Sequence, residues 1–201
     1  EGAESKEDFD FWNKKLSGTI EAIELPYSNI KTTPLASIEQ EGISSLELSG
    51  TVIQQLKALA KASKVNLSIL MLALFKVLLH KLTSAEDVII KTPIAGRLNE
   101  KYAKSVGYYI NMMLARTSIL GDDTFTEIIR KVKTEFLSNI DYAKYPYAKL
   151  LTTLEATKGK GDIFSIVYTY QNIFGEVLNQ EEQANIKLVE SLKQNAVEDY
   201  S

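Results

Sequence analysis

Histidine and cysteine, two residues often used as general bases, nucleophiles and metal ligands, are nearly absent from this chain. His80 is the only histidine among 201 residues, and cysteine is absent. Lys81 follows His80, and no carboxylate lies one helical turn away on the same face, so a packed or half-exposed helix-end histidine is favoured over a general base. Without cysteine, disulfides and thiolate zinc sites are excluded, which fits a reducing, cytoplasmic setting.

Other signatures of catalysis or ligand binding are missing or incomplete. No G-x-S-x-G elbow marks a nucleophilic serine. The segment Gly159–Asp162 has a lysine between glycines but lacks the spacing and the trailing Ser or Thr of a phosphate loop. Asp122 and Asp123 precede a predicted helix, where helix capping is favoured over metal binding. The net charge of −3 provides no basic field, so we expect no nucleic acid partner.

One amide stands in the middle of a long apolar stretch. The stretch SVGYYINMMLART covers residues 105–117, and Asn111 interrupts it. A buried amide is costly unless it is hydrogen-bonded, so we expect Asn111 to have partners. Tyrosines are the other notable polar groups, and they cluster in three segments: Tyr108, Tyr109, Tyr142, Tyr145, Tyr147, Tyr168 and Tyr170. Core aromatics with their hydroxyls at the rim are favoured over a partly polar channel wall.

Periodicity and turn residues predict the elements that must position these side chains. We expect helices at 10–18, 52–60, 67–82, 125–140 and 147–156, and strands at 43–49, 105–117 and 162–172. A further buried strand begins at 87 and passes into a loop before 97. Asn66 is the predicted N-cap of the third helix, and Thr124 with Glu127 has capping-box spacing. Apolar strands between helices predict an α/β fold, with a sheet covered on both faces. The longest apolar stretch, 67–82, is broken by Lys76 and is short for a membrane span, so we expect no membrane partner.

Several segments, taken in order, resemble one known domain. They are DFWNKKLSG, LKALAKASKVNLSILMLALFKVLLHKLTSAEDVIIKTPIAGR, SVGYYINMMLART, YPYAKLL and IFSIVYTYQN. Together they resemble the second half of the condensation domain of nonribosomal peptide synthetases, from about Phe9 to Asn172. By this resemblance, residues 1–201 are a partial C-terminal lobe of such a domain.

The resemblance rests on family motifs that this chain matches with some departures. The matches to the G-x-P-x-x-G-R turn are Pro93, Gly96 and Arg97, with Lys91 at its first glycine. The matches to V-G-x-F-V-N-T and its trailing arginine are Val106, Gly107, Asn111 and Arg116, with Met112 in place of threonine. The matches to Q-D-Y-P-F-E are Tyr145, Pro146 and Tyr147, with Ala143, Lys144 and Ala148 at the Gln, Asp and Glu positions. An arginine-rich motif is reduced to ATKGKGD before the last strand.

The resemblance implies a fold and an activity. The family fold is similar to chloramphenicol acetyltransferase, with two lobes around a tunnel, and this chain would be one lobe with a mixed sheet covered by helices. Upstream and downstream carrier proteins deliver substrates on phosphopantetheine arms, and the acceptor amine attacks the donor thioester to form an amide. The H-H-x-x-x-D-G motif belongs to the N-terminal lobe, so we expect no catalytic residue and no bound cofactor in this chain. We expect the isolated chain to be inactive, and a dimer through an exposed sheet edge is a further expectation.

The resemblance also names candidates for the tunnel wall or the contact between lobes: Asn111, Gly107, Tyr109, Arg97, Arg116, Tyr145 and Pro146. Asn111 could lock a loop to its strand, shape the tunnel through backbone contacts, or bind a tethered substrate. Gly107 is a candidate for close approach by a helix or ligand. Arg97 and Arg116 could pair with carboxylates of the other lobe or contact a pantetheine phosphate. Two alternatives stay open: a degenerate carrier-binding or recruitment domain, and a sister acyltransferase or epimerisation domain of the same fold.

Overall fold

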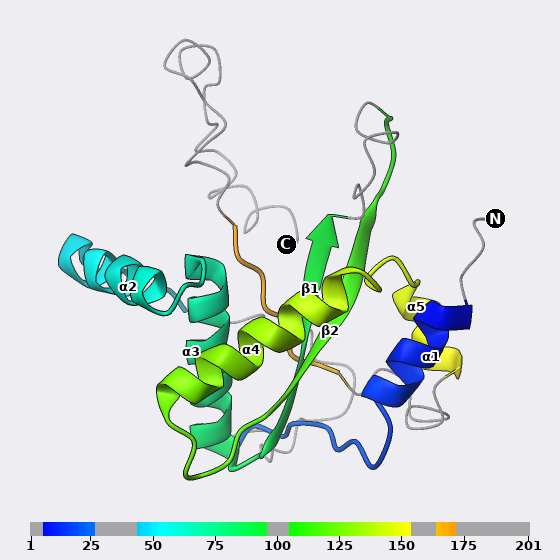
Figure 1. Ribbon diagram of the computed structural model, residues 1–201, viewed down its shortest axis with the longest axis horizontal. Helices are drawn as coiled ribbons and strands as arrows, with labels where there is room; N and C mark the ends of the chain where they lie inside the picture. Colours follow the sequence, from blue (N-terminus) through cyan, green and yellow to red (C-terminus); the bar gives the residue numbers. More distant parts are fainter. Residues whose placement is uncertain (1–5, 27–43, 96–104, 154–163, 172–201) are drawn as a thin grey trace, which may run out of the picture. The chain divides into compact units, whose positions relative to one another are not determined.

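The computed structural model describes residues 6–26, 44–95, 105–153 and 164–171. The chain divides into two compact units, Glu1–Thr169 and Tyr170–Ser201, and the first of them contains all the named elements. In chain order they are α1 (Lys6–Lys15), α2 (Gly50–Ala62), α3 (Leu67–Thr83), β1 (Asp87–Ala95), β2 (Ile110–Ser118), α4 (Phe125–Ile140) and α5 (Tyr147–Thr153) (Figure 1).

The sheet is built on the antiparallel pair of β1 and β2. Their register runs from Asp87 opposite Ser118 to Ala95 opposite Ile110. On the other edge of β1, the Lys91 N–H donates to the Ile166 carbonyl at 3.0 Å, and the Tyr168 N–H donates to the Lys91 carbonyl at 2.8 Å. This second pairing is parallel. Parallel and antiparallel pairings therefore meet on β1, as a mixed sheet requires.

The strand predicted at 162–172 is wrong in its length, because the observed pairing is much shorter. Within the described residues 164–171, only Val167 forms a bridge, opposite Lys91. The proline at position 93 gives a physical reason. The next N–H on this edge of β1 would belong to Pro93, which has none, so the parallel ladder cannot continue past Lys91.

Two other strand predictions need correction. Ser44–Ser49 is irregular and exposed, with Leu46 at 86% exposure, and none of these residues pairs with a described strand. The strand expected at 105–117 is found at Ile110–Ser118, because Ile110 pairs with Ala95, where β1 ends. Residues 105–109 therefore extend past the last pair of the ladder. A strand needs a partner edge, and an alternating pattern alone does not supply one.

The helix predictions hold because their signals are local. The Asn66 side chain accepts from the Ile69 N–H at 2.9 Å at the start of α3. Thr124 and Glu127 form the predicted capping box at the start of α4. Helix α1 begins at Lys6, earlier than the predicted Asp10, and its first turn carries two acidic residues that favour a helix N-terminus.

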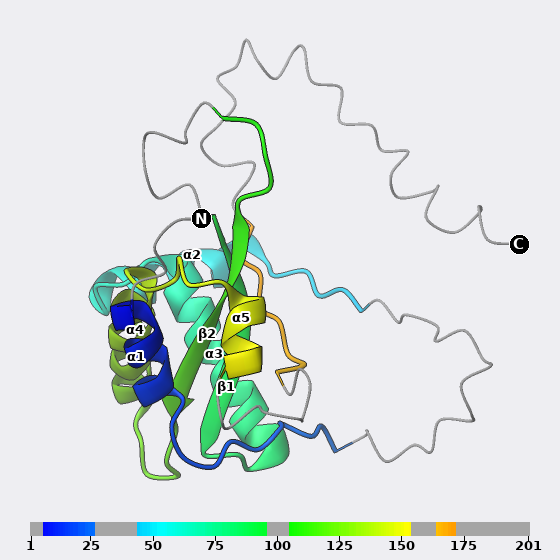
Figure 2. The ribbon, with the colours of Figure 1, turned by 90° about the vertical axis from the view of Figure 1, so that its right-hand side faces the viewer.

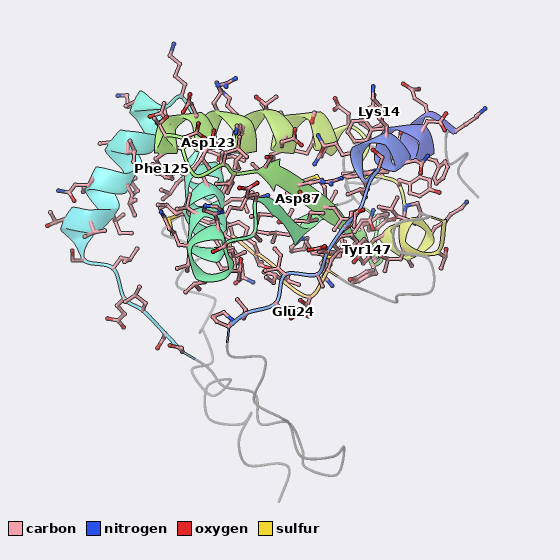
Figure 3. All side chains as sticks on the ribbon, turned by 90° about the horizontal axis from the view of Figure 1, so that it is seen from below. Lys14, Glu24, Asp87, Asp123, Phe125 and Tyr147 are labelled. Carbon is pink, nitrogen blue, oxygen red and sulfur yellow. The ribbon has the colours of Figure 1, made fainter. Side chains whose placement is uncertain are left out.

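The core consists of two clusters of buried side chains, each of which includes residues of the sheet. Val88 and Ile90, alternate residues of β1, pack with residues of α3 and α4. Ile89 of β1 and Leu114 of β2 pack with residues of α1 and α5. Figures 2 and 3 show α1 next to α4 beside the sheet, where Lys15 of α1 forms an ion pair with Glu135 of α4. Helices thus cover the sheet, and the predicted α/β fold is confirmed.

No single helix of the described ranges is long and apolar enough to cross a membrane. Helices α2 and α3 reach that length only when taken together, and they are bent by 101° at their junction.

Candidate functional site

The side-chain amide of Asn111 binds the backbone of one loop. Its Nδ2 donates to the Ala143 carbonyl at 2.8 Å and to the Tyr145 carbonyl at 2.7 Å. Its Oδ1 accepts from the Tyr147 N–H at 3.2 Å. We call this arrangement the Asn111 clamp. It attaches the loop between α4 and α5 to β2. This is the loop-locking role that was one of the three considered for Asn111.

The clamped loop carries the Tyr-Pro-Tyr residues of the family motif. Tyr145 is buried, and its ring lies 6.1 Å from that of Phe9 in α1. Pro146 precedes α5, and its carbonyl accepts from the Leu150 N–H at 3.0 Å in the first turn of that helix. The Lys91 Nζ lies 5.6 Å from the centroid of the Tyr147 ring. Tyr145 and Pro146 therefore position the loop and α5, and Tyr145 fits the core-aromatic interpretation.

Gly107 does allow a close approach, but the neighbour is in its own segment. A Cβ at Gly107 would lie 3.1 Å from the ring of Tyr109. The Tyr109 hydroxyl in turn forms a 2.7 Å hydrogen bond with the Ser105 hydroxyl. Gly107 thus leaves room for the Tyr109 ring to fold back over the segment before β2.

Arg116 binds partners within this chain, and the contacts expected for it with another lobe or a pantetheine phosphate stay predictions. Its Nε and Nη2 donate to the Asp87 carboxylate at 3.0 and 2.7 Å. Its Nη1 donates to the carbonyls of Lys15 and Ser17 at 3.0 and 2.9 Å, at the C-terminal end of α1. Helix C-termini leave carbonyls without helical partners and favour cations, so Arg116 fastens α1 to the sheet. Arg97 lies outside the described residues.

His80 is a helix-end residue, as expected. Its Nδ1 lies 2.8 Å from the Ala85 carbonyl just after α3, and since a carbonyl can only accept, Nδ1 carries the proton. In the part of the chain that the structure describes, no group of three or more His, Cys, Asp or Glu residues could hold a metal ion.

Sequence reasoning missed two buried polar residues that hold β2. The Nδ2 of Asn139, in α4, donates to the Leu114 carbonyl at 2.9 Å and is fully buried. Lys76 of α3 is also fully buried and bonds to both strands. Lys76 stands out in the sequence as a charged residue within an otherwise apolar helix, but the sequence does not show which groups it binds.

The chemistry of this region is that of positioning. Asn111, Asn139 and Arg116 all bind backbone carbonyls and fix β2 against α4, α1 and the loop before α5. These groups orient and bind; they do not transfer protons readily at neutral pH. Within the described residues, the arrangement suits a wall that holds other groups in place.

Comparison with known proteins gives a consistent picture. The family model "Condensation domain" matches residues 1–200. The polyketide synthase PksN of Bacillus subtilis (strain 168) is 28% identical over 200 residues, which are 96% of this chain and 4% of that protein. A linear gramicidin synthase protein of Brevibacillus parabrevis is 27% identical over 192 residues, which are 94% of this chain and 4% of that protein.

Solved structures agree with the fold. A four-domain nonribosomal peptide synthetase, holo-AB3403, matches with a TM-score of 0.69 and 26% identity, over 87% of this chain and 13% of that one. The first condensation domain of the calcium-dependent antibiotic synthetase matches with a TM-score of 0.60 and 17% identity, over 74% of this chain and 31% of that one. The chain thus spans a small part of its relatives, and over almost its whole length it belongs to the condensation domain family.

Proposed function

We propose that this chain is one lobe of a condensation domain that joins two carrier-bound substrates through an amide bond. In this reaction the acceptor amine attacks the donor thioester, a C–N bond forms, the C–S bond breaks, and the carrier thiol leaves with a proton. The observation that carries the proposal is the family match over residues 1–200. The polyketide synthase and gramicidin synthase relatives are much longer proteins, of which a segment like this is a few per cent.

In this proposal the chain contributes positioning. Aminolysis of a thioester needs two long arms held end to end, and correct orientation can supply a large part of a rate enhancement. The Asn111 clamp and the Arg116 contacts fix the strand and loop that carry the family motifs. A pair of adjacent histidines cannot come from these 201 residues, because they contain a single histidine. We propose that the general base belongs to an N-terminal lobe of the same domain.

The partners that follow from this proposal are the N-terminal lobe and two carrier domains. Their phosphopantetheine arms would carry both substrates, so the lobe itself needs no bound cofactor. Residues Gly107 and Tyr109 remain proposed contacts of the tunnel, next to the strand that holds Asn111.

The test compares the parent protein with the isolated chain. Carrier proteins loaded with an acyl donor and an aminoacyl acceptor are mixed with each, and the amide product is measured by mass spectrometry. We expect product with the intact protein and none with residues 1–201 alone. Heat-treated intact protein is the control for uncatalysed aminolysis. Product from the isolated chain would contradict the division of labour between lobes, and no product from an intact, correctly loaded protein would overturn the proposed activity.

A further inference from the structure

Lys76 is a fully buried lysine in the middle of α3. Its relative exposure is 0%. Its Nζ donates to the Val88 carbonyl at 3.0 Å, to the Ala115 carbonyl at 2.7 Å and to the Thr117 hydroxyl at 2.9 Å. The first acceptor lies on β1 and the other two lie on β2. One side chain thus connects the helix to both strands of the antiparallel pair.

The three atoms that accept from Lys76 are all uncharged. The charged groups that act on the Lys76 amine are Glu135 on α4, Asp87 on β1 and Lys15 on α1, while Lys57 and Lys61 occupy exposed positions of α2. The two carboxylates already have cationic partners, since Asp87 binds Arg116 and Glu135 is paired with Lys15. An ammonium at position 76 therefore loses its hydration without gaining a carboxylate of its own.

Both protonation states of Lys76 can satisfy the same three groups. An ammonium donates three hydrogens to the two carbonyls and the hydroxyl. A neutral amine donates two hydrogens to the carbonyls, and its lone pair accepts from the Thr117 hydroxyl once that hydroxyl turns to donate. The two states thus differ in charge and not in the number of hydrogen bonds.

We propose that Lys76 is a proton-controlled lock between α3 and the β1–β2 sheet, which holds the helix more tightly when the amine is uncharged than when it is an ammonium. The hydrogen bonds of Lys76 to both strands hold the helix to the sheet. Because the amine is buried away from water, the strength of this attachment depends on its charge. This inference goes beyond the proposed function and does not depend on it.

The direction of the pH dependence follows from proton linkage. Burial lowers the pKa of Lys76 from 10.5 to about 7, and Glu135, Asp87 and Lys15 contribute less. Between these two values, an opened state in which Lys76 reaches water binds a proton that the closed state lacks, so the closed state gains stability as the pH rises. One proton corresponds to about a tenfold change in the closing equilibrium per pH unit. Below about pH 7 the amine is charged in both states, and this dependence ends.

The test is hydrogen–deuterium exchange of the intact protein at about pH 7.5, 8.5 and 9.5, with protection factors corrected for the intrinsic exchange rate. The variants are Lys76→Met, which removes the titrating amine, and Lys81→Met, a matched control at an exposed position of the same helix. We expect the α3 protection factor of the wild type, divided by that of Lys76→Met, to rise about tenfold per pH unit. The Lys81→Met protein should follow the wild type.

A ratio that stays constant across this window would show that Lys76 does not change charge, and would overturn the proposal. If Lys76→Met does not fold, Thr117→Val serves as the second variant, because it keeps the amine and removes one partner. Its α3 protection should be lower than that of the wild type at each pH and should still rise with pH in parallel. A wild-type α3 whose protection factor does not rise between about pH 7.5 and 9.5 overturns the proposal without any variant.

Discussion

Asn111 directs both ends of its amide at the backbone of a single loop, which makes its contribution measurable. Asn111→Ala would leave the carbonyls of Ala143 and Tyr145 and the Tyr147 N–H without their partner, at a cost of about 1–3 kcal/mol. Asn111→Asp should be worse, because it places a carboxylate oxygen against two carbonyl oxygens. The free energy of unfolding, measured in urea, should therefore be highest for the wild type, lower for Asn111→Ala and lowest for Asn111→Asp.

Asn13→Ala is the matched control for the Asn111 variants, because Asn13 is an exposed asparagine in α1. It should unfold within about 0.5 kcal/mol of the wild type, as surface substitutions usually do. Amide exchange should also become faster in residues 141–147 of the Asn111 variants and stay unchanged in α3. Equal stability of Asn111→Ala and the control would contradict the clamp.

The need for partners at Asn111 could be predicted from the sequence, but the partners could not. A lone amide in an apolar strand must be bonded, and that much is local information. Its partners lie 32, 34 and 36 residues away along the chain. Arg116 shows the same limit, since its contacts at Lys15 and Ser17 are 101 and 99 residues away. The motif match identified both residues, but Asp87, the carboxylate that Arg116 binds, was not among the contacts that it suggested.

At the level of elements, α1 is attached to the sheet by its buried apolar side chains and by a few polar contacts around one tryptophan. Trp12 is 2% exposed, and its indole N–H donates to the Tyr142 carbonyl at 2.9 Å. Arg116 holds the C-terminal end of the same helix through two carbonyls. Trp12 is also the only tryptophan in the chain, so the tryptophan fluorescence comes from α1 and changes when Trp12 becomes exposed.

Arg116→Ala should loosen α1 from the sheet. The change removes the hydrogen bonds to two helix-end carbonyls and leaves the Asp87 carboxylate without its partner, a loss of about 2 kcal/mol. We expect Trp12 emission to shift to longer wavelength at lower urea concentration than in the wild type. Arg130→Ala is the control, because Arg130 is an exposed arginine on α4. An unchanged Trp12 transition would show that Arg116 does not hold α1.

Helices could be predicted from the sequence better than strands, and the reason is physical. Caps such as Asn66 and the Thr124–Glu127 box act within a few residues of the helix they begin. A strand exists only where another strand offers an edge, so the pattern at 43–49 predicted a strand that the described residues 44–49 do not form. Pro93 is a second example. It stops the parallel pairing of β1 with the segment around Val167, which is far from β1 in the sequence.

At the level of the whole molecule, this chain has apolar side chains that it does not bury. In the segment leading into β2, Val106 is fully exposed, Tyr108 is 84% exposed and Ile110 is 51% exposed. Exposed apolar residues beside a strand favour association with another chain.

The isolated 201-residue chain should therefore self-associate, and the contact should include this segment. Sedimentation velocity should show a weight-average coefficient that rises with protein concentration. The double variant Tyr108→Lys with Ile110→Lys should stay monomeric at higher concentration, because two charges would have to be desolvated in the contact. Leu137→Lys is the matched control, since Leu137 is 54% exposed on α4 and lies outside the segment. If the double variant associates as strongly as Leu137→Lys, the contact lies elsewhere, and a chain that stays monomeric throughout contradicts the expectation altogether.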